Sequence, residues 1–138
     1  MLKKYGINWF YLIVGVLCIL FAFTHTINGL QHSLKELNNI EINSGTRTVF
    51  TYVWHIIGIE NLVFGIALII MAFIKNRENV KFTVWVIMAI LITRLIIISV
   101  FTFMNGEASI IELLIDSIAI IVVTVLLYIG TRIKNKIE

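Results

Sequence analysis

Four long apolar runs dominate this chain and limit what it can fold into. They cover residues 9–30, 50–74, 82–104 and 110–129. A helix needs about 20 predominantly apolar residues to cross the hydrocarbon core of a bilayer, and each run is long enough. Only 14% of the residues are charged, against about 25% in an average soluble domain, so the chain lacks the polar surface to cover itself in water. The sequence therefore predicts an all-α polytopic membrane protein, a four-transmembrane-helix bundle forming a single membrane domain over 1–138.

The positive charges outside these runs predict the orientation of the bundle. With four crossings, the segments before the first helix, between the second and third, and after the fourth share one side. The cations of these segments are Lys3, Lys4, Lys75, Arg77, Lys81, Arg132, Lys134 and Lys136. The other side has only Lys35 and Arg47. Because Lys and Arg are enriched in cytoplasmic segments, we predict a multi-pass protein of the cell membrane with both termini in the cytoplasm.

The net charge of +3 bears on the partners of the chain. Its cations lie at the predicted helix ends rather than on one basic face, so we predict membrane lipids as partners and no nucleic acid. Association with further copies of the chain is left open, and no protein partner is predicted.

Ionisable residues inside the apolar runs are the strongest site candidates. Arg94 falls almost at the midplane of the third run, Glu60 within about one turn of the midplane of the second, and Asp116 about one turn from that of the fourth. A charge at the bilayer centre costs about 2.5–3.5 kcal/mol, and a guanidinium cannot lose its proton. We therefore expect Arg94 to contact Glu60, with Asp116 near enough to share its field. The pair is either a structural ion pair or the floor of a ligand site.

Polar side chains also gather toward the predicted outer side of the bundle. His25, Asn28 and His32 recur at i, i+3 and i+7 and so form one polar stripe on a helix. Glu112, near the start of the fourth run, brings an acid to the same outer region. His25 and His55 have matching depths, about two turns from the centres of their runs. We expect these two histidines to approach each other in one polar region.

The sequence predicts neither a metal site nor a catalytic site. Two histidines at one depth meet the minimum for a bis-histidine haem, but no further haem signal accompanies them. A regular helix also separates His55 from Glu60 by about 140°, so the two face one narrow axis only where the backbone distorts, for example near Gly58. Cys18 is the only cysteine, which excludes a multi-cysteine site. No triad, HExxH, phosphate-loop or EF-hand pattern occurs, so we predict no enzyme activity and no cofactor.

Four segments, in their order along the chain, carry a family resemblance. They are "FAFTHTINGLQHSL", "WHIIGIENLVFGIALIIMAFIKN", "TRLIIISV" and "IELLIDSIAIIVVTVLLYIGTRIKNKIE". Together they resemble the phosphate-starvation-inducible PsiE family of small four-helix inner-membrane proteins. The most specific elements are Glu60, "RLII" at 94–97 and "ELLIDSIAI"; His25 and Asp116 are not carried over from the family. The resemblance implies a link to phosphate or nutrient stress and names no biochemical activity.

Three interpretations of function remain open at this point. The first is a non-enzymatic small membrane protein of the PsiE type. The second is a transport or ligand-binding bundle with a polar cavity in its outer half. That cavity would use His25, His55, Glu60, Arg94 and Asp116. The third is a haem or quinone redox protein of the membrane.

The predicted orientation can be tested by thiol labelling. Single cysteines are introduced as Asn43→Cys and Asn76→Cys in a Cys18→Ala background. An impermeant thiol reagent should label position 43 in intact cells and position 76 only after permeabilisation. The reverse pattern would contradict the orientation and leave the number of helices unaffected.

Overall fold

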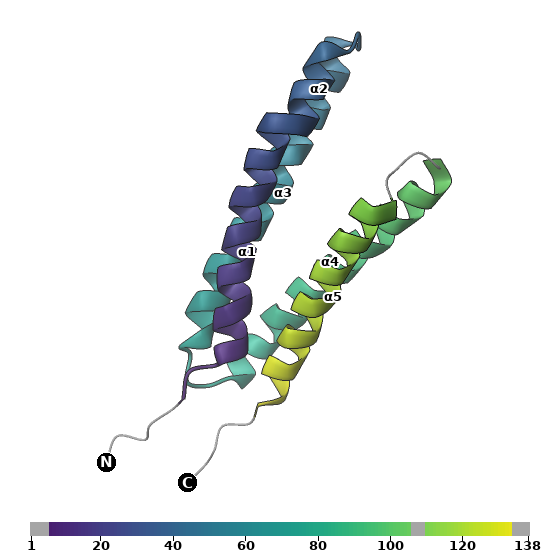
Figure 1. The fold of residues 1–138 in the computed structure, drawn as a ribbon. Helices are drawn as coiled ribbons and strands as arrows, with labels where there is room; N and C mark the ends of the chain where they lie inside the picture. The colour runs from purple at the N-terminus through teal and green to yellow at the C-terminus, as the bar shows by residue number, and fades with distance from the viewer. Residues whose placement is uncertain (1–5, 106–109, 134–138) are drawn as a thin grey trace, which may run out of the picture. The chain divides into compact units, whose positions relative to one another are not determined.

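The computed structural model describes residues 6–105 and 110–133, and every regular element in these ranges is helical. In chain order the elements are α1 (Trp9–Asn28), the π-helical turn η1 (Gly29–Ser33), α2 (Leu34–Asn39), α3 (Ser44–Ala72), α4 (Glu78–Asn105) and α5 (Ile110–Arg132) (Figure 1). Helices long and apolar enough to cross a membrane span Trp9–Asn39, Ser44–Ala72, Glu78–Met104 and Leu113–Arg132. The predicted all-α class with four transmembrane helices is confirmed, while the orientation of the termini stays a prediction.

The helices extend beyond the apolar runs because polar residues, rather than hydropathy, set their ends. The side-chain oxygen of Asn43 accepts the N–H of Gly45 at 2.7 Å where α3 begins. The side-chain oxygen of Asn76 accepts the N–H of Glu78 at 3.2 Å where α4 begins. At 1.5 Å per residue the 31-residue helix Trp9–Asn39 is about 46 Å long, against roughly 30 Å for a hydrocarbon core. Its far end therefore extends beyond the apolar layer.

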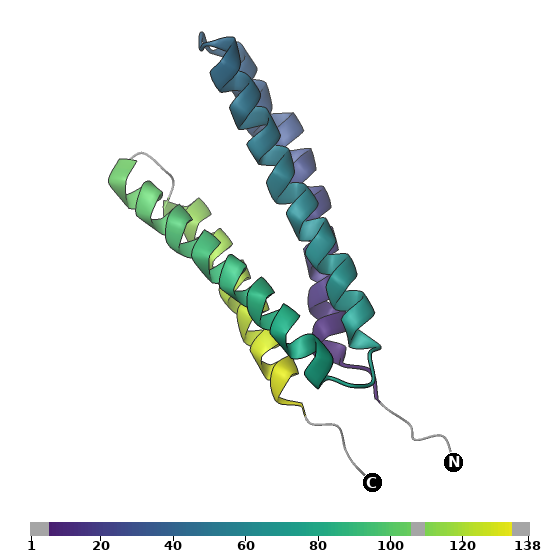
Figure 2. The ribbon, with the colours of Figure 1, turned by 180° about the vertical axis from the view of Figure 1, so that it is seen from behind.

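The chain divides into two compact units, and residues 15–69 form one of them. Within it α1 and α3 lie side by side (Figures 1 and 2). A Cβ atom on Gly65 would lie 2.7 Å from the carbonyl oxygen of Gly15 and 2.6 Å from a side-chain carbon of Ile19. The two backbones thus touch at a pair of glycines, with Cys18 and Ala22 buried along the same face of α1. Small residues permit such close approach, which drives helix pairing where lipid offers no hydrophobic contrast.

The other unit comprises the described residues of Met1–Val14 and Ile70–Glu138. Its main packing is α4 against α5, two antiparallel helices that lie side by side in both views. The buried side chains include Val84, Met88 and Leu91 from α4 and Val123 and Leu127 from α5. Their spacing of three and four residues gives each helix one apolar face toward its neighbour.

Two polar residues, Asn8 and Arg77, connect chain segments at one end of this unit. Asn8, which is 1% exposed, donates its backbone N–H to the carbonyl of Ala72 and its side-chain N–H to the carbonyl of Gly130, both at 3.0 Å. Arg77 donates to the carbonyl of Gly6 at 2.8 Å and to that of Ile133 at 3.4 Å. Ala72 and Gly130 lie in the last turns of α3 and α5, where a carbonyl has no partner in its own helix, so Asn8 satisfies both.

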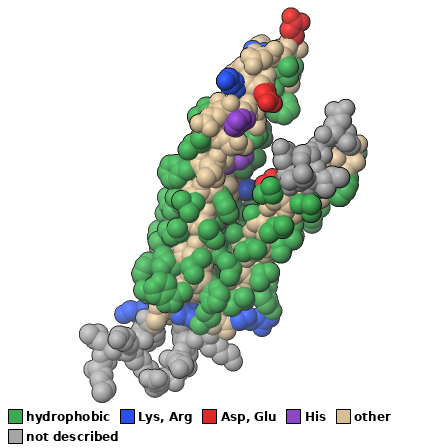
Figure 3. All heavy atoms as spheres, in the orientation of Figure 1, with side chains coloured by type: hydrophobic (Ala, Val, Ile, Leu, Met, Phe, Trp, Pro, Cys, Tyr) green, Lys and Arg blue, Asp and Glu red, His purple; other side chains and the backbone are tan. Residues whose placement is uncertain are grey.

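Large apolar side chains remain exposed along the helices of both units. Phe23, Ile59 and Phe103 are 60%, 61% and 75% exposed. Figure 3 shows hydrophobic side chains over the visible flanks, with Lys and Arg side chains at the end where α4 begins and α5 ends. Apolar surface of this extent marks contact with a membrane or a partner, which agrees with a multi-pass membrane protein.

The glycine contact between α1 and α3 makes a testable prediction. Gly65→Ala should lower the free energy of unfolding by about 1–3 kcal/mol, because the added methyl group meets backbone that cannot move aside. Gly6→Ala is the control, since a Cβ at Gly6 meets nothing within 4 Å. Unfolding in mixed micelles, followed by circular dichroism, measures the difference. Equal stability of the two variants would contradict the close packing.

Candidate functional site

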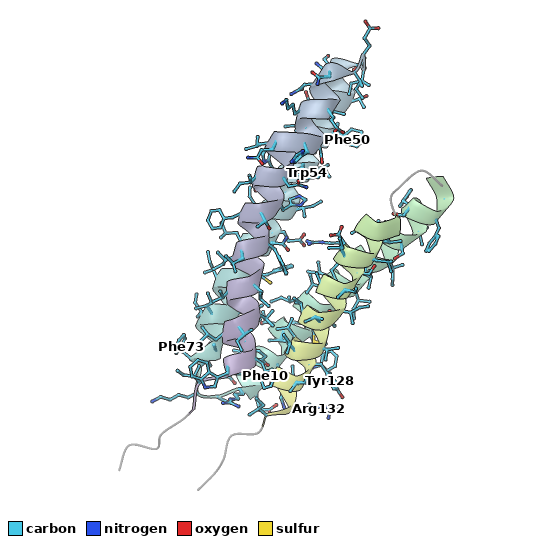
Figure 4. The ribbon with its side chains drawn as sticks, viewed as in Figure 1. Phe10, Phe50, Trp54, Phe73, Tyr128 and Arg132 are labelled. Atoms are coloured by element: carbon cyan, nitrogen blue, oxygen red, sulfur yellow. The ribbon has the colours of Figure 1, made fainter. Side chains whose placement is uncertain are left out.

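His25 and Trp54 join α1 to α3 through their rings and backbones. The rings stack with centroids 4.5 Å apart and an interplanar angle of 10°. The indole N–H of Trp54 donates to the carbonyl of His25 at 3.1 Å. The Nε2 atom of His25 lies 3.2 Å from the carbonyl oxygen of Trp54, and because a carbonyl can only accept, this nitrogen carries the proton. Figure 4 shows Trp54 on α3, beside α1. The arrangement fixes the ring orientation of His25.

Gly29 makes room for the indole of Trp54. A Cβ atom at Gly29 would overlap the indole ring, so no larger residue fits. The π-helical turn η1 begins at this glycine, and the N–H of Leu34 closes it on the Gly29 carbonyl. Such turns insert one residue into a helix, and they are frequent at functional sites. The turn carries α1 past the indole and onward into α2.

An open hollow of about 490 Å³ lies on α3. It is lined by Arg47, Thr48, Thr51, Tyr52, His55, Ile56 and Ile59. Thr48, Tyr52, His55 and Ile59 recur at i, i+4, i+7 and i+11, so one face of the helix forms most of the lining. Polar groups occupy the end near Ser44, and isoleucines occupy the opposite end. The hollow is therefore amphipathic along its length.

The polar groups of the hollow are held in place by α3 and the connection before it. A guanidinium nitrogen of Arg47 donates to the carbonyl of Ile40 at 3.0 Å, while its buried Nε atom has no hydrogen-bond partner among the described residues. The hydroxyls of Thr48 and Thr51 donate to the carbonyls of Ser44 and Arg47 at 3.0 and 2.9 Å. Because each hydroxyl donates its proton to a backbone carbonyl, its oxygen faces the hollow as an acceptor.

The depth of the hollow follows from the length of α3. About 20 residues of helix fill the hydrocarbon core. Counted from Ala72 at one boundary, residue 52 lies near the other. Arg47 and Thr48 then lie in the head-group layer, whereas Ile56 and Ile59 lie in hydrocarbon. The hollow crosses the boundary between water and lipid.

The two sequence-predicted histidines take different positions. His25 has Trp54 as its ring partner, whereas His55 lines the hollow. Neighbouring residues project about 100° apart around a helix, so Trp54 and His55 face different directions from α3. The expected approach of His25 and His55 in one polar region stays a prediction.

The intramembrane acids and the arginine lie on three helices. Glu60 in α3 and Arg94 in α4 are half-buried, and neither is without a partner. Arg94 continues the face of α4 that carries Ile87 and Leu91. Asp116 in α5 is exposed. The expected contact between Glu60 and Arg94 stays a prediction.

The outer polar stripe is interrupted by the π-helical turn. Asn28 and His32 are exposed, and His32 lies within η1, where the regular 100° spacing does not hold. The side chain of Glu112 is outside the part of the chain that the structure describes. No group of three or more His, Cys, Asp or Glu residues in the described ranges could hold a metal ion.

Sequence reasoning missed several residues of these sites. Arg47 enters the sequence analysis only as an orienting charge, and Trp54 does not enter it as a site residue. The spacing of Thr48, Tyr52 and His55 is the sequence signal that could have identified the hollow. Nothing in the sequence pairs Gly29 with the indole, because that contact depends on the register of α1 against α3.

Comparison with protein-family models, curated proteins and solved structures finds no match to this chain. Its fold and apolar helices define a small multi-pass integral membrane protein.

The reciprocal bonds between His25 and Trp54 can be tested with Trp54→Phe. This change keeps an aromatic ring against His25 and removes the indole N–H. We expect a loss of about 0.5–1.5 kcal/mol in the free energy of unfolding, the usual worth of one such hydrogen bond. Trp9→Phe is the control because Trp9 is 61% exposed. If both variants unfold alike in mixed micelles, the bond does not contribute.

Proposed function

We propose that this chain is a non-enzymatic membrane protein of the PsiE type that binds a small amphipathic anion in the hollow on α3. The observation that supports binding is the hollow itself, which combines the guanidinium of Arg47 with hydrogen-bonding groups and an apolar end. The four-segment resemblance supports the PsiE type. The setting that this resemblance implies is phosphate or nutrient stress.

The chemistry of the lining favours an anionic group at the polar end. The guanidinium of Arg47 is positively charged, and no carboxylate is among the lining residues to neutralise it. The Tyr52 hydroxyl and the His55 ring can donate further hydrogen bonds. Ile56 and Ile59 offer an apolar surface deeper along the same face. A carboxylate or phosphate ester with a short hydrocarbon body matches this order of groups.

Binding is favoured over catalysis because the lining lacks a reactive pair. Nucleophilic catalysis needs a serine, cysteine or threonine activated by a neighbouring base. The hydroxyls of Thr48 and Thr51 donate to backbone carbonyls instead of to His55. No acid lines the hollow to share general acid and base roles with His55. Transport would use the same groups for entry of the anion from the predicted outer side.

The preference of the hollow for anions can be tested with charged thiol reagents. Thr48→Cys in a Cys18→Ala background should react faster with an anionic methanethiosulfonate than with a cationic one, relative to a free thiol. Adding Arg47→Gln should lower this ratio about tenfold, because one unit charge about 6 Å away in water changes the two rates about threefold each, in opposite directions. Lys35→Gln, an exposed cation outside the lining, is the control. An unchanged ratio in Arg47→Gln would contradict the anion preference.

The PsiE-type assignment has a separate test in growing cells. The amount of the protein should rise when inorganic phosphate is withdrawn from the medium. A parallel culture limited for nitrogen separates a phosphate response from general starvation. A constant level under phosphate limitation would contradict the assignment and leave the binding proposal intact.

A further inference from the structure

Three side chains from α4 and α5 form a continuous cluster near the ends of these helices. The rings of Trp85 and Tyr128 meet edge to face, with centroids 6.1 Å apart and an interplanar angle of 80°. The guanidinium carbon of Arg132 lies 4.9 Å from the centroid of the Tyr128 ring, and one of its nitrogens donates to the Tyr128 hydroxyl at 2.6 Å. Trp85 and Tyr128 remain 47% and 40% exposed, and Arg132 is exposed as well. Figure 4 shows Tyr128 and Arg132 at the end of α5.

Among the described residues, no carboxylate forms a salt bridge with Arg132. Its contacts with Tyr128 are with a neutral ring and hydroxyl, and they use only one or two of the five N–H donors of the guanidinium. Lys81, at the same end of the unit, is in contrast paired with Glu78 at 2.5 Å. Arg132 is also the last residue of its apolar span. It therefore presents a fork of donors at the depth where lipid phosphates lie.

An apolar groove lies between the same two helices, deeper in the span. It is lined by Ile92, Leu95, Ile120, Ile121, Thr124 and Val125. Ile92 lies two turns beyond Trp85, and Thr124 and Ile121 lie one and two turns before Tyr128, on nearly the same faces. The groove thus continues the cluster along the helices toward the middle of the membrane.

Thr124 adds an unsatisfied polar group to the groove. Its hydroxyl oxygen is buried and has no hydrogen-bond partner within the described residues. A threonine in a membrane helix commonly donates to the carbonyl one turn earlier, as Thr24 and Thr26 do here. Thr124 lies about 12 Å along the helix from Arg132. The oxygen itself is enclosed by protein atoms, so a chain in the groove meets the remaining atoms of Thr124.

We propose that the cluster and the groove together bind one anionic phospholipid. Arg132 holds the phosphate, the rings of Trp85 and Tyr128 flank the glycerol region, and an acyl chain lies in the groove. The order of groups along the helices, from cation through aromatic rings to apolar groove, is the order of groups in a phospholipid. A free phosphate ion would use Arg132 and leave the groove unexplained.

Native mass spectrometry of the full chain tests the site with two lipids of equal acyl chains. Phosphatidylglycerol should be retained as one molecule per chain and in preference to phosphatidylcholine. Arg132→Gln should weaken phosphatidylglycerol retention about fivefold, the usual effect of one cation at an anionic membrane surface. Lys81→Gln is the matched control and should leave retention unchanged. Equal retention of both lipids, or equal loss in both variants, would overturn the proposal.

Two further variants separate lipid binding from misfolding and from phosphate binding. Arg132→Lys keeps the charge and should keep the preference for phosphatidylglycerol, whereas loss of that preference would count against a charge-based site. Ile121→Trp fills the groove and should reduce retention of both lipids while the helical circular dichroism stays unchanged. Millimolar inorganic phosphate should not displace the lipid. Displacement by phosphate would show that the groove takes no part, and would overturn the assignment to a phospholipid.

Discussion

The cost of leaving a peptide group without a hydrogen bond in hydrocarbon shapes every element of this protein. Such a group costs several kcal/mol in lipid, so a chain with four apolar runs must form helices there. Once the backbone is satisfied, apolar side chains gain little by meeting each other instead of lipid. Close backbone contact then becomes the available source of pairing energy. This explains why the backbones of α1 and α3 touch at Gly15 and Gly65.

The same constraint moves specific polar contacts to the helix ends. The last carbonyls of a helix have no partner within it. Asn8 reaches the carbonyls of Ala72 and Gly130, and Arg77 reaches those of Gly6 and Ile133. His25 and Trp54 also place side-chain donors on carbonyls of the facing helix, with Trp54 well inside α3. These bonds join segments that no helix ladder connects.

The sequence predicts the helices and does not identify the contacts between them, for one physical reason. Length and hydropathy are local properties, so four spans could be recognised from the four apolar runs. Helix ends depend on single capping groups such as Asn43 and Asn76, so the runs underestimate the helices. Register between helices depends on contacts between residues far apart in sequence. The stacking of His25 on Trp54, the neighbour of His55, could therefore not be predicted from depth alone. Depth places a residue along a helix and says nothing about its direction.

The cations at the end of α5 carry two kinds of information that depend on different physics. Their number predicts orientation through the bias of membrane insertion, which does not require any particular contact. Arg132 additionally has a defined position, because its guanidinium lies over the Tyr128 ring and donates to the Tyr128 hydroxyl. Its positive charge is thereby held beside the groove, where it favours an anionic head group. Lipid binding in turn stabilises the packed form of α4 and α5 in proportion to the logarithm of lipid concentration. Extraction into detergent should therefore lower the stability of the packing between α4 and α5. The loss should begin at the groove beside Thr124, whose hydroxyl has no hydrogen-bond partner among the described residues.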